Sequence, residues 1–218
     1  SVVGKVKRDL LKEFGIENDV TLVLGSHDQI CSALGAGAVR SGDAVDGMGT
    51  VECVTAVFDA IDYDLRMGKQ GYVLVPYAVP GLFCTYMFNY SSGSLINWFK
   101  NDVLHDYRGA YSDFFSYIES GMAGGPSGIL TLPYFAGAAT PYQNIGAKGA
   151  VLNLTTAASD ADLYRSILEG TAMEMRLNAE IVRKYGVRVK SAVATGGGAN
   201  SEKWMQIKAD IQNISIRV

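Results

Sequence analysis

Cysteine, net charge and long apolar runs are all scarce in this sequence of 218 residues. Its three cysteines, Cys31, Cys53 and Cys84, follow no metal-binding or disulfide spacing, which favours a reducing, cytoplasmic location. A net charge of only −3 gives no bulk attraction to nucleic acid or to an anionic membrane surface. No apolar run reaches the ~18 residues that cross a bilayer. We therefore expect neither a nucleic acid nor a membrane as a partner.

Glycine is the residue that the sequence has in plenty, with 25 copies that fall in separate turns. The hydrophobic share of 48% and the charged share of 19% are those of an ordinary globular protein. Both ends of the chain look cut, because residues 9–14 already read as a helix and residues 214–218 read as the opening of a strand. We therefore expect a fragment of a longer enzyme.

The turn Gly196-Gly197-Gly198 separates a predicted strand from a predicted helix. Residues 191–195 are apolar, as in a buried strand, and Asn200 or Ser201 is expected to cap the helix that follows. The helix is indicated by regularly spaced apolar side chains, which are Trp204, Ile207 and Ile211. Such a turn can hold a nucleotide at the helix start, or it can simply let the helix pack on the sheet. The glycines alone favour the packing role.

Asp28 stands between a predicted strand over residues 18–24 and a predicted helix over residues 29–39. That position is the carboxyl end of a strand, where ligands bind in open α/β sheets. A carboxylate at the start of a helix also serves as a plain N-cap, which is the competing interpretation. The neighbouring His27 is interpreted as a turn residue rather than a proton carrier.

A second candidate ligand contact is the turn predicted at residues 46–50, which precedes a predicted strand over residues 51–58. Its backbone N–H groups and the Thr50 hydroxyl are able to cradle a phosphate. A plain β-hairpin turn explains the same pattern equally well.

The rest of the chain is read from its hydrophobic periodicity and its turn residues. The pattern predicts strands over residues 72–75 and 82–89, and helices over residues 94–104, 111–118 and 161–184. The aromatic residues of the second of these helices are assigned to the core, and Glu169 to a solvated or capping position. Residues 128–149 are predicted to form a long irregular loop, either functional or a rigid connection.

Four segments together resemble the carbohydrate kinase family named for its Phe-Gly-Gly-Tyr (FGGY) signature, which includes xylulose, gluconate, fuculose, rhamnulose and glycerol kinases. The resemblance covers essentially the whole chain. Its segments are residues 25–29 with Ala33, Gly35 and Gly37; residues 47–52; residues 146–155 with 163–170; and residues 196–201 with Trp204, Gln206, Ala209, Asp210 and Ile211. The last two segments, in this order and spacing, are specific to the family.

The resemblance implies an α/β fold of the actin and Hsp70 ATPase type, with a ribonuclease-H-like mixed sheet flanked by helices. It implies that residues 1–44 form the end of an amino-terminal sugar-binding domain, and residues 45–218 a carboxy-terminal nucleotide-binding domain. The family's amino-terminal half, with its first phosphate turn, a metal-binding aspartate and most sugar contacts, has no counterpart here. The last helix of the second domain is missing too. We expect the piece alone to be inactive.

The implied activity is ATP-dependent transfer of a phosphoryl group to a hydroxyl of a ketose or related polyol, with magnesium accompanying ATP. The resemblance assigns Asp28 as general base, and it assigns no metal ligand within this chain. The nucleotide contacts are assigned to Gly49, Thr50, Gly93, Ile96, Asn97, Gly197, Gly198 and Asn200. The helix starts after Asp28, Gly93 and Asn200 would each offer partial positive charge toward phosphate or a polar base edge of the ligand. Val51 stands where the family usually has serine, so one hydroxyl near the phosphates is absent.

Two other interpretations compete with this one. A non-catalytic nucleotide-binding or regulatory member of the same superfold is the main alternative, although an aspartate retained at position 28 argues against it. A Rossmann-type dehydrogenase is disfavoured, because its glycine motif would follow the first strand, whereas the glycines here come late and contiguous. The expected partners are a sugar or polyol and ATP, and the assembly state is open, a homodimer included.

Overall fold

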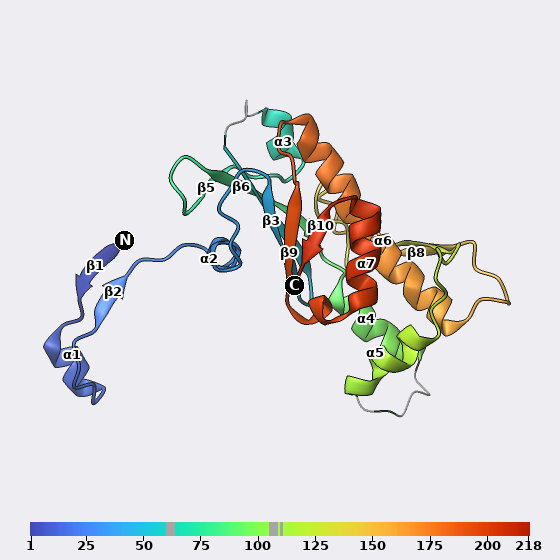
Figure 1. The fold of residues 1–218 in the computed structure, drawn as a ribbon, viewed down its shortest axis with the longest axis horizontal. Helices are drawn as coiled ribbons and strands as arrows, with labels where there is room; N and C mark the ends of the chain where they lie inside the picture. The colour runs from blue at the N-terminus through green and yellow to red at the C-terminus, as the bar shows by residue number, and fades with distance from the viewer. Residues whose placement is uncertain (60–63, 105–108, 110) are drawn as a thin grey trace.

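The computed structural model describes residues 1–59, 64–104, 109 and 111–218, and its centre is a mixed six-stranded sheet (Figure 1). In spatial order its strands are β10 (Ser215–Arg217), β9 (Ser191–Thr195), β3 (Asp43–Met48), β4 (Glu52–Phe58), β6 (Phe83–Asn89) and β5 (Val75–Pro76). The neighbours β3, β4, β6 and β5 pair antiparallel, whereas β9 and β10 run parallel to β3. The mixed α/β architecture expected from the sequence is confirmed.

The remaining described elements are helices and two small sheets, one of which lies to the side of the central sheet (Figure 1). The helices are α1 (Arg8–Glu13), α2 (Asp28–Gly35), α3 (Leu65–Lys69), α4 (Gly93–Trp98), α5 (Tyr111–Ser120), α6 (Asp160–Lys184) and α7 (Glu202–Gln212). A π-helical turn over Phe99–Val103 continues α4, and a 3₁₀ turn over Gly197–Asn200 precedes α7. The small sheets pair β1 (Val2–Lys5) with β2 (Thr21–Val23) and β7 (Leu130–Leu132) with β8 (Ala150–Leu152).

Both faces of the central sheet are covered, which is why every residue of β4 is buried. Successive side chains of a strand point to opposite faces. Val54 and Met87 therefore pack with Met175 of α6, while Val45 packs with Ile30 of α2 on the other face. None of the helices in the described ranges is long and apolar enough to cross a membrane.

A third apolar cluster closes the end of the sheet where β3 finishes. Met48 there packs in one cluster with Phe99, Phe114 of α5, Tyr164 of α6 and Trp204 of α7. The prediction that the aromatic residues of α5 belong to the core is thus confirmed for Phe114, which is fully buried, and wrong for Tyr117, whose side chain is exposed. This cluster fixes α4, α5 and α7 around one end of the sheet.

The first 24 residues stand apart from the rest. Figure 1 shows β1, α1 and β2 extending to one side of the central sheet, joined to it by the stretch that leads into α2. Several apolar side chains of this part are exposed, among them Val2, Phe14, Leu22, Val23 and Leu24. Apolar side chains of this kind are normally covered in a folded protein.

Two predicted strand boundaries were wrong. The strand predicted at residues 72–75 is only Val75–Pro76, because the fully buried Tyr72 is a core residue whose hydroxyl donates to Asn178 Oδ1 at 2.7 Å. Conversely, β3 extends through Met48, so the turn before β4 is shorter than predicted. That turn is also a hairpin turn, since β3 and β4 pair antiparallel.

Three other local predictions need correction. The helix predicted over 94–104 becomes π-helical from Phe99 onward. The predicted irregular loop over 128–149 contains β7, which pairs with β8 just beyond it. Glu169 is buried rather than solvated, because Arg165 donates to its carboxylate at 2.7 Å and Ser127 Oγ at 2.9 Å.

Candidate functional site

A cavity of about 580 Å³ lies beside the end of β3. Its walls are formed by the β3–β4 turn (residues 49–51), by the first residues of α4, by one side of α5 and by the turn before α7. The lining residues are Met48, Gly49, Thr50, Gly93, Ile96, Asn97, Phe115, Ser116, Glu119, Gly197, Gly198, Asn200, Ser201 and Trp204. All eight residues that the sequence assigned to the nucleotide lie on this surface, although they come from three separate segments.

The β3–β4 turn and the start of α4 are joined backbone to backbone. The Gly93 N–H donates to the Gly49 carbonyl at 3.1 Å, and the Ser94 N–H donates to the Thr50 carbonyl at 2.9 Å. A Cβ atom on Gly93 would lie 2.4 Å from the Gly49 oxygen, so a side chain at this position would push the turn away. The resemblance led us to expect that this helix start offers partial positive charge toward phosphate or a polar base edge. These two N–H groups instead hold the turn.

The three glycines of the turn before α7 have different surroundings. Gly196 has a φ of 89°, and a Cβ atom there would lie 2.6 Å from the Met48 carbonyl oxygen. A Cβ atom on Gly198 would lie 2.6 Å from the Trp204 ring. A Cβ atom on Gly197 would meet nothing within 4 Å among the described residues. The outer glycines therefore serve packing, while the middle one borders open space.

Ser201 links the start of α7 to α5. Its hydroxyl donates to Glu119 Oε1 at 2.6 Å and accepts the Trp204 N–H at 3.0 Å, so it is the helix cap. Ser116 and Glu119 add a hydroxyl and a carboxylate from α5 to the cavity wall. These groups can exchange hydrogen bonds with hydroxyl or amino groups of a ligand.

A buried cluster of charges adjoins the cavity. Lys208 of α7 is fully buried, and its ammonium group contacts Asp46 Oδ2 at 2.8 Å and also Glu52 Oε1. Glu52 Oε2 accepts the Ser92 hydroxyl at 3.1 Å. Asp46 Oδ1 has no hydrogen-bond partner among the residues that the structure describes. Two buried carboxylates therefore share one buried cation.

Burial decides how this cluster titrates. It raises the pKa of the Glu52 carboxyl to about 7, because Lys208, which Glu52 shares with Asp46, offsets only part of the cost of desolvation. Burial alone would lower the pKa of Lys208, but Asp46 and Glu52 together raise it. Lys208 is therefore charged throughout the physiological range, while Glu52 titrates near neutrality.

We expect the folded chain to lose stability as Glu52 ionises, between its ordinary pKa of 4.5 and its folded pKa of about 7. The folded state binds this proton more tightly than the unfolded state, so the contribution is complete below 4.5 and is lost as the pH rises through 7. The loss approaches about 3 kcal/mol. Denaturant unfolding of the native chain and Glu52→Gln at about pH 5 and about pH 8 measures it. An identical pH dependence in both proteins would contradict the prediction.

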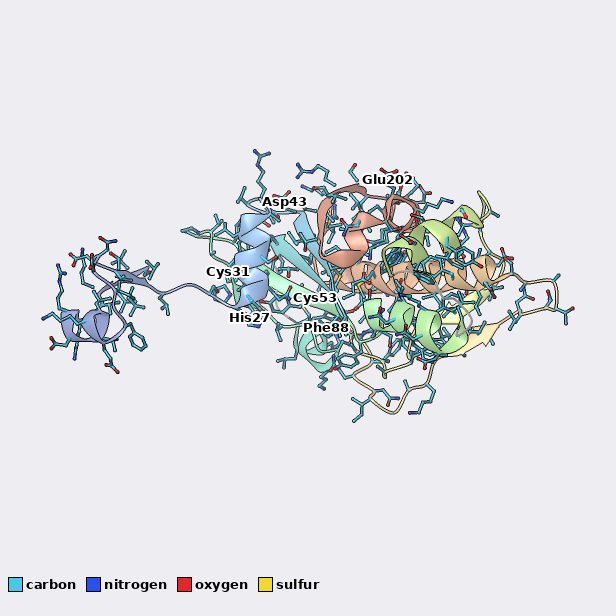
Figure 2. All side chains as sticks on the ribbon, turned by 90° about the horizontal axis from the view of Figure 1, so that it is seen from below. His27, Cys31, Asp43, Cys53, Phe88 and Glu202 are labelled. Carbon is cyan, nitrogen blue, oxygen red and sulfur yellow. The ribbon has the colours of Figure 1, made fainter. Side chains whose placement is uncertain are left out.

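Asp28 lies outside the cavity. The N-cap of α2 is His27, whose Nδ1 accepts the Gln29 N–H at 3.3 Å, so Asp28 is not the plain N-cap. Asp28 Oδ1 accepts the same N–H at 2.8 Å, and the Asp28 side chain is 84% exposed. Figure 2 shows His27, at the start of α2, well apart from Glu202, at the start of α7. The structure thus does not bring Asp28 together with the eight cavity residues.

Residues 48–218 match the C-terminal domain of the FGGY family of carbohydrate kinases. The chain belongs to this family. The match begins at the last residue of β3 and includes every lining residue of the cavity. The cavity is therefore a feature of the FGGY domain, whereas Asp28 lies before it in the sequence.

Known FGGY kinases match over almost the whole chain. The xylulose kinase of Staphylococcus epidermidis is 29% identical over 219 residues, which are 100% of this chain and 42% of that protein. The xylulose kinase of Bacillus subtilis is 25% identical over 217 residues, which are 98% of this chain and 42% of that protein. The solved structure of xylulose kinase from Rhodospirillum rubrum has a TM-score of 0.83 at 25% identity, covering 99% of this chain and 42% of that one. The chain spans less than half the length of these FGGY proteins.

Carboxylate and imidazole ligands are sparse around the cavity of this FGGY chain. No group of three or more His, Cys, Asp or Glu side chains among the described residues is arranged to hold a metal ion. Among the lining residues the carboxylate is that of Glu119, which already accepts the Ser201 hydroxyl.

Six lining residues of the FGGY domain were not predicted as site residues: Met48, Phe115, Ser116, Glu119, Ser201 and Trp204. Ser201 and Trp204 were predicted, but only as the cap and the apolar face of a helix. The three residues of α5 come from a segment whose aromatic pattern indicates core packing. Nothing in the local sequence of α5 marks the side that meets the cavity, because that side is set by packing against other helices.

Proposed function

We propose that this chain supplies the nucleotide-binding half and the general base of an ATP-dependent sugar kinase. The shared cavity is the observation that supports the proposal most directly, since eight residues from three distant segments line one surface. The FGGY match and the xylulose kinases among the relatives support a ketose or a related polyol as phosphoryl acceptor.

We place the phosphates of ATP near the β3–β4 turn and its nucleoside at the other end of the cavity, near Gly197 and Asn200. Thr50 offers a hydroxyl at the first end. Open space beside Gly197 can admit a flat ring, and Glu119 and Asn200 can bond to its polar edge or to the ribose. The eleven-residue helix α7 starts at this cavity and adds the partial positive charge of its amino terminus.

Asp28 has the role of general base in this proposal. The hydroxyl oxygen of the sugar bonds to the γ-phosphorus of ATP, its proton passes to the Asp28 carboxylate, and the bond to the bridging oxygen of ADP breaks. Because Asp28 is exposed and outside the cavity, the sugar would lie between the two sites. We assign residues 1–44 to the sugar-binding domain and 45–218 to the nucleotide domain, whose closure would exclude water.

Gly197→Leu is expected to weaken ATP binding by at least about tenfold, because the new side chain fills open space in the cavity. The fold is expected to keep its stability within about 1 kcal/mol, since Gly197 has no positive φ and no close neighbour. Calorimetric titration with magnesium and ATP measures the affinity. Gly125→Leu is the matched control, because it too meets nothing within 4 Å and lies outside the cavity. Equal affinity of the two variants would show that the nucleotide binds elsewhere.

Sugar-dependent release of ADP tests the kinase proposal itself. The complete gene product is assayed with ATP and a panel of pentuloses, hexuloses, glycerol and gluconate. Turnover with one member of the panel supports the proposal and names the substrate. Binding of ATP without ADP release on any member would instead favour the non-catalytic, regulatory alternative.

A further inference from the structure

Glu52 connects the three segments that carry the predicted nucleotide contacts. It is the first residue of β4 and directly follows the β3–β4 turn. Its Oε1 contacts the ammonium group of Lys208 on α7, and its Oε2 accepts the hydroxyl of Ser92, the residue before α4, at 3.1 Å. All three side chains are fully buried. One carboxylate therefore ties the turn, the start of α4 and α7 together without lining the cavity itself.

Stability alone does not account for this arrangement. Glu52 and Asp46 share the single ammonium of Lys208, so the buried cluster carries an excess negative charge whenever Glu52 is ionised. Buried ion pairs can often be replaced by apolar side chains of similar volume with no loss of stability. A cluster with one carboxylate too many is costlier than a simple pair. Its geometry therefore points to a role beyond holding the fold.

The contacts around Glu52 lead directly to the cavity wall. Gly93 and Ser94, which follow Ser92, donate their N–H groups to the Gly49 and Thr50 carbonyls. On the other side, Lys208 follows Trp204 by one helical turn, and its Nζ lies 5.9 Å from the centre of the Trp204 ring. A displacement of Glu52 would thus move the β3–β4 turn and the start of α4 relative to α7.

We propose that Glu52 is a positioning residue for the nucleotide cavity. By holding Ser92 and Lys208 at once, it keeps the β3–β4 turn and the start of α4 in register with α7, so that the phosphate and nucleoside ends of the cavity stay at a fixed separation. This inference rests on the proposed nucleotide site and adds to it a buried residue that touches no ligand.

Two variants separate positioning from a purely structural role. Glu52→Leu removes the contacts to Ser92 and Lys208 and leaves Lys208 paired with Asp46 alone. Asp46→Asn removes a carboxylate from the same lysine but keeps the contact between Glu52 and Ser92. Asp46 borders a different cavity, of about 340 Å³, between the sheet and α6. Each variant therefore leaves one carboxylate with one ammonium, and only the first frees the start of α4.

Amide hydrogen exchange at about pH 7.5 measures, without any ligand, how firmly the start of α4 is held against the β3–β4 turn. The Gly93 and Ser94 amides are expected to exchange about tenfold faster in Glu52→Leu than in the native chain. This factor corresponds to the loss of one hydrogen bond to a charged group. In Asp46→Asn the two amides are expected to exchange at the native rate. The dissociation constant for ATP is expected to rise about tenfold in Glu52→Leu and to stay within about twofold in Asp46→Asn. Glu52→Leu is expected to unfold at no lower denaturant concentration than the native chain.

The outcomes distinguish this inference from the proposed function. Equal exchange rates and equal ATP affinities in the two variants would overturn the positioning role. Faster exchange in Glu52→Leu alone, in a chain that binds no ATP, would support the link between turn and helix and overturn the nucleotide assignment. Ser92→Ala keeps every charge and tests the same link if Glu52→Leu does not fold: exchange of the Gly93 and Ser94 amides at the native rate would overturn the inference.

Discussion

Asp28→Asn is expected to lower the rate of sugar phosphorylation by ~10²–10⁴-fold, the usual contribution of a general base. Asparagine can still accept the Gln29 N–H, so the start of α2 is preserved, but it cannot take the proton of the attacking hydroxyl. ATP binding is expected to stay nearly intact, because Asp28 does not line the cavity. Steady-state kinetics of the complete gene product and a calorimetric titration with ATP measure the two effects.

The matched control is Asp9→Asn, which removes another exposed carboxylate from residues 1–44 and is expected to leave turnover unchanged. Near-normal turnover of Asp28→Asn would show that the base is another group. Loss of ATP affinity together with turnover would show instead that Asp28 acts through the nucleotide site.

Lys208→Met is expected to lower the free energy of unfolding by about 3–5 kcal/mol, since it leaves two carboxylates buried without a cation. The deficit should shrink at about pH 5, where the Glu52 carboxyl, whose pKa is raised by burial, is protonated and no longer adds an unpaired charge. Lys203→Met, at an exposed position of the same helix, is the control and is expected to cost less than about 1 kcal/mol. Denaturant unfolding of both variants checks this, and similar losses in the two would be inconsistent with a buried charge cluster.

Local sequence patterns predicted the elements around the cavity well. The strand at residues 191–195, the Ser201 cap and the helix beginning near residue 161 follow from apolar spacing and capping chemistry, and all three are confirmed. These signals act over a few residues, so a single sequence carries them. The eight nucleotide contacts came from the family resemblance, because no local pattern says that three distant turns meet.

What the sequence could not reveal depends on contacts across the fold. Glu169 was predicted to be solvated or a capping partner, because helix periodicity cannot show that Ser127, 42 positions earlier, would bond to it in the interior. The helix start at Gly93 was expected to offer its partial positive charge toward phosphate or a polar base edge, whereas the Gly93 N–H donates to the Gly49 carbonyl. Lys208 did leave a signal: it follows the buried Trp204 by four positions, which places a lysine on the inner face of α7.

The three charges at positions 46, 52 and 208 constrain how this part of the protein can diverge. Replacing the lysine alone leaves two buried carboxylates without a cation, and replacing both carboxylates leaves a buried ammonium without an anion. Either change is expected to lower the free energy of unfolding. A series of substitutions that keeps the stability of the fold must therefore include a protein with one carboxylate paired with the lysine. Homologous sequences with an apolar residue in place of Lys208 are therefore expected to lack acidic residues at both partner positions.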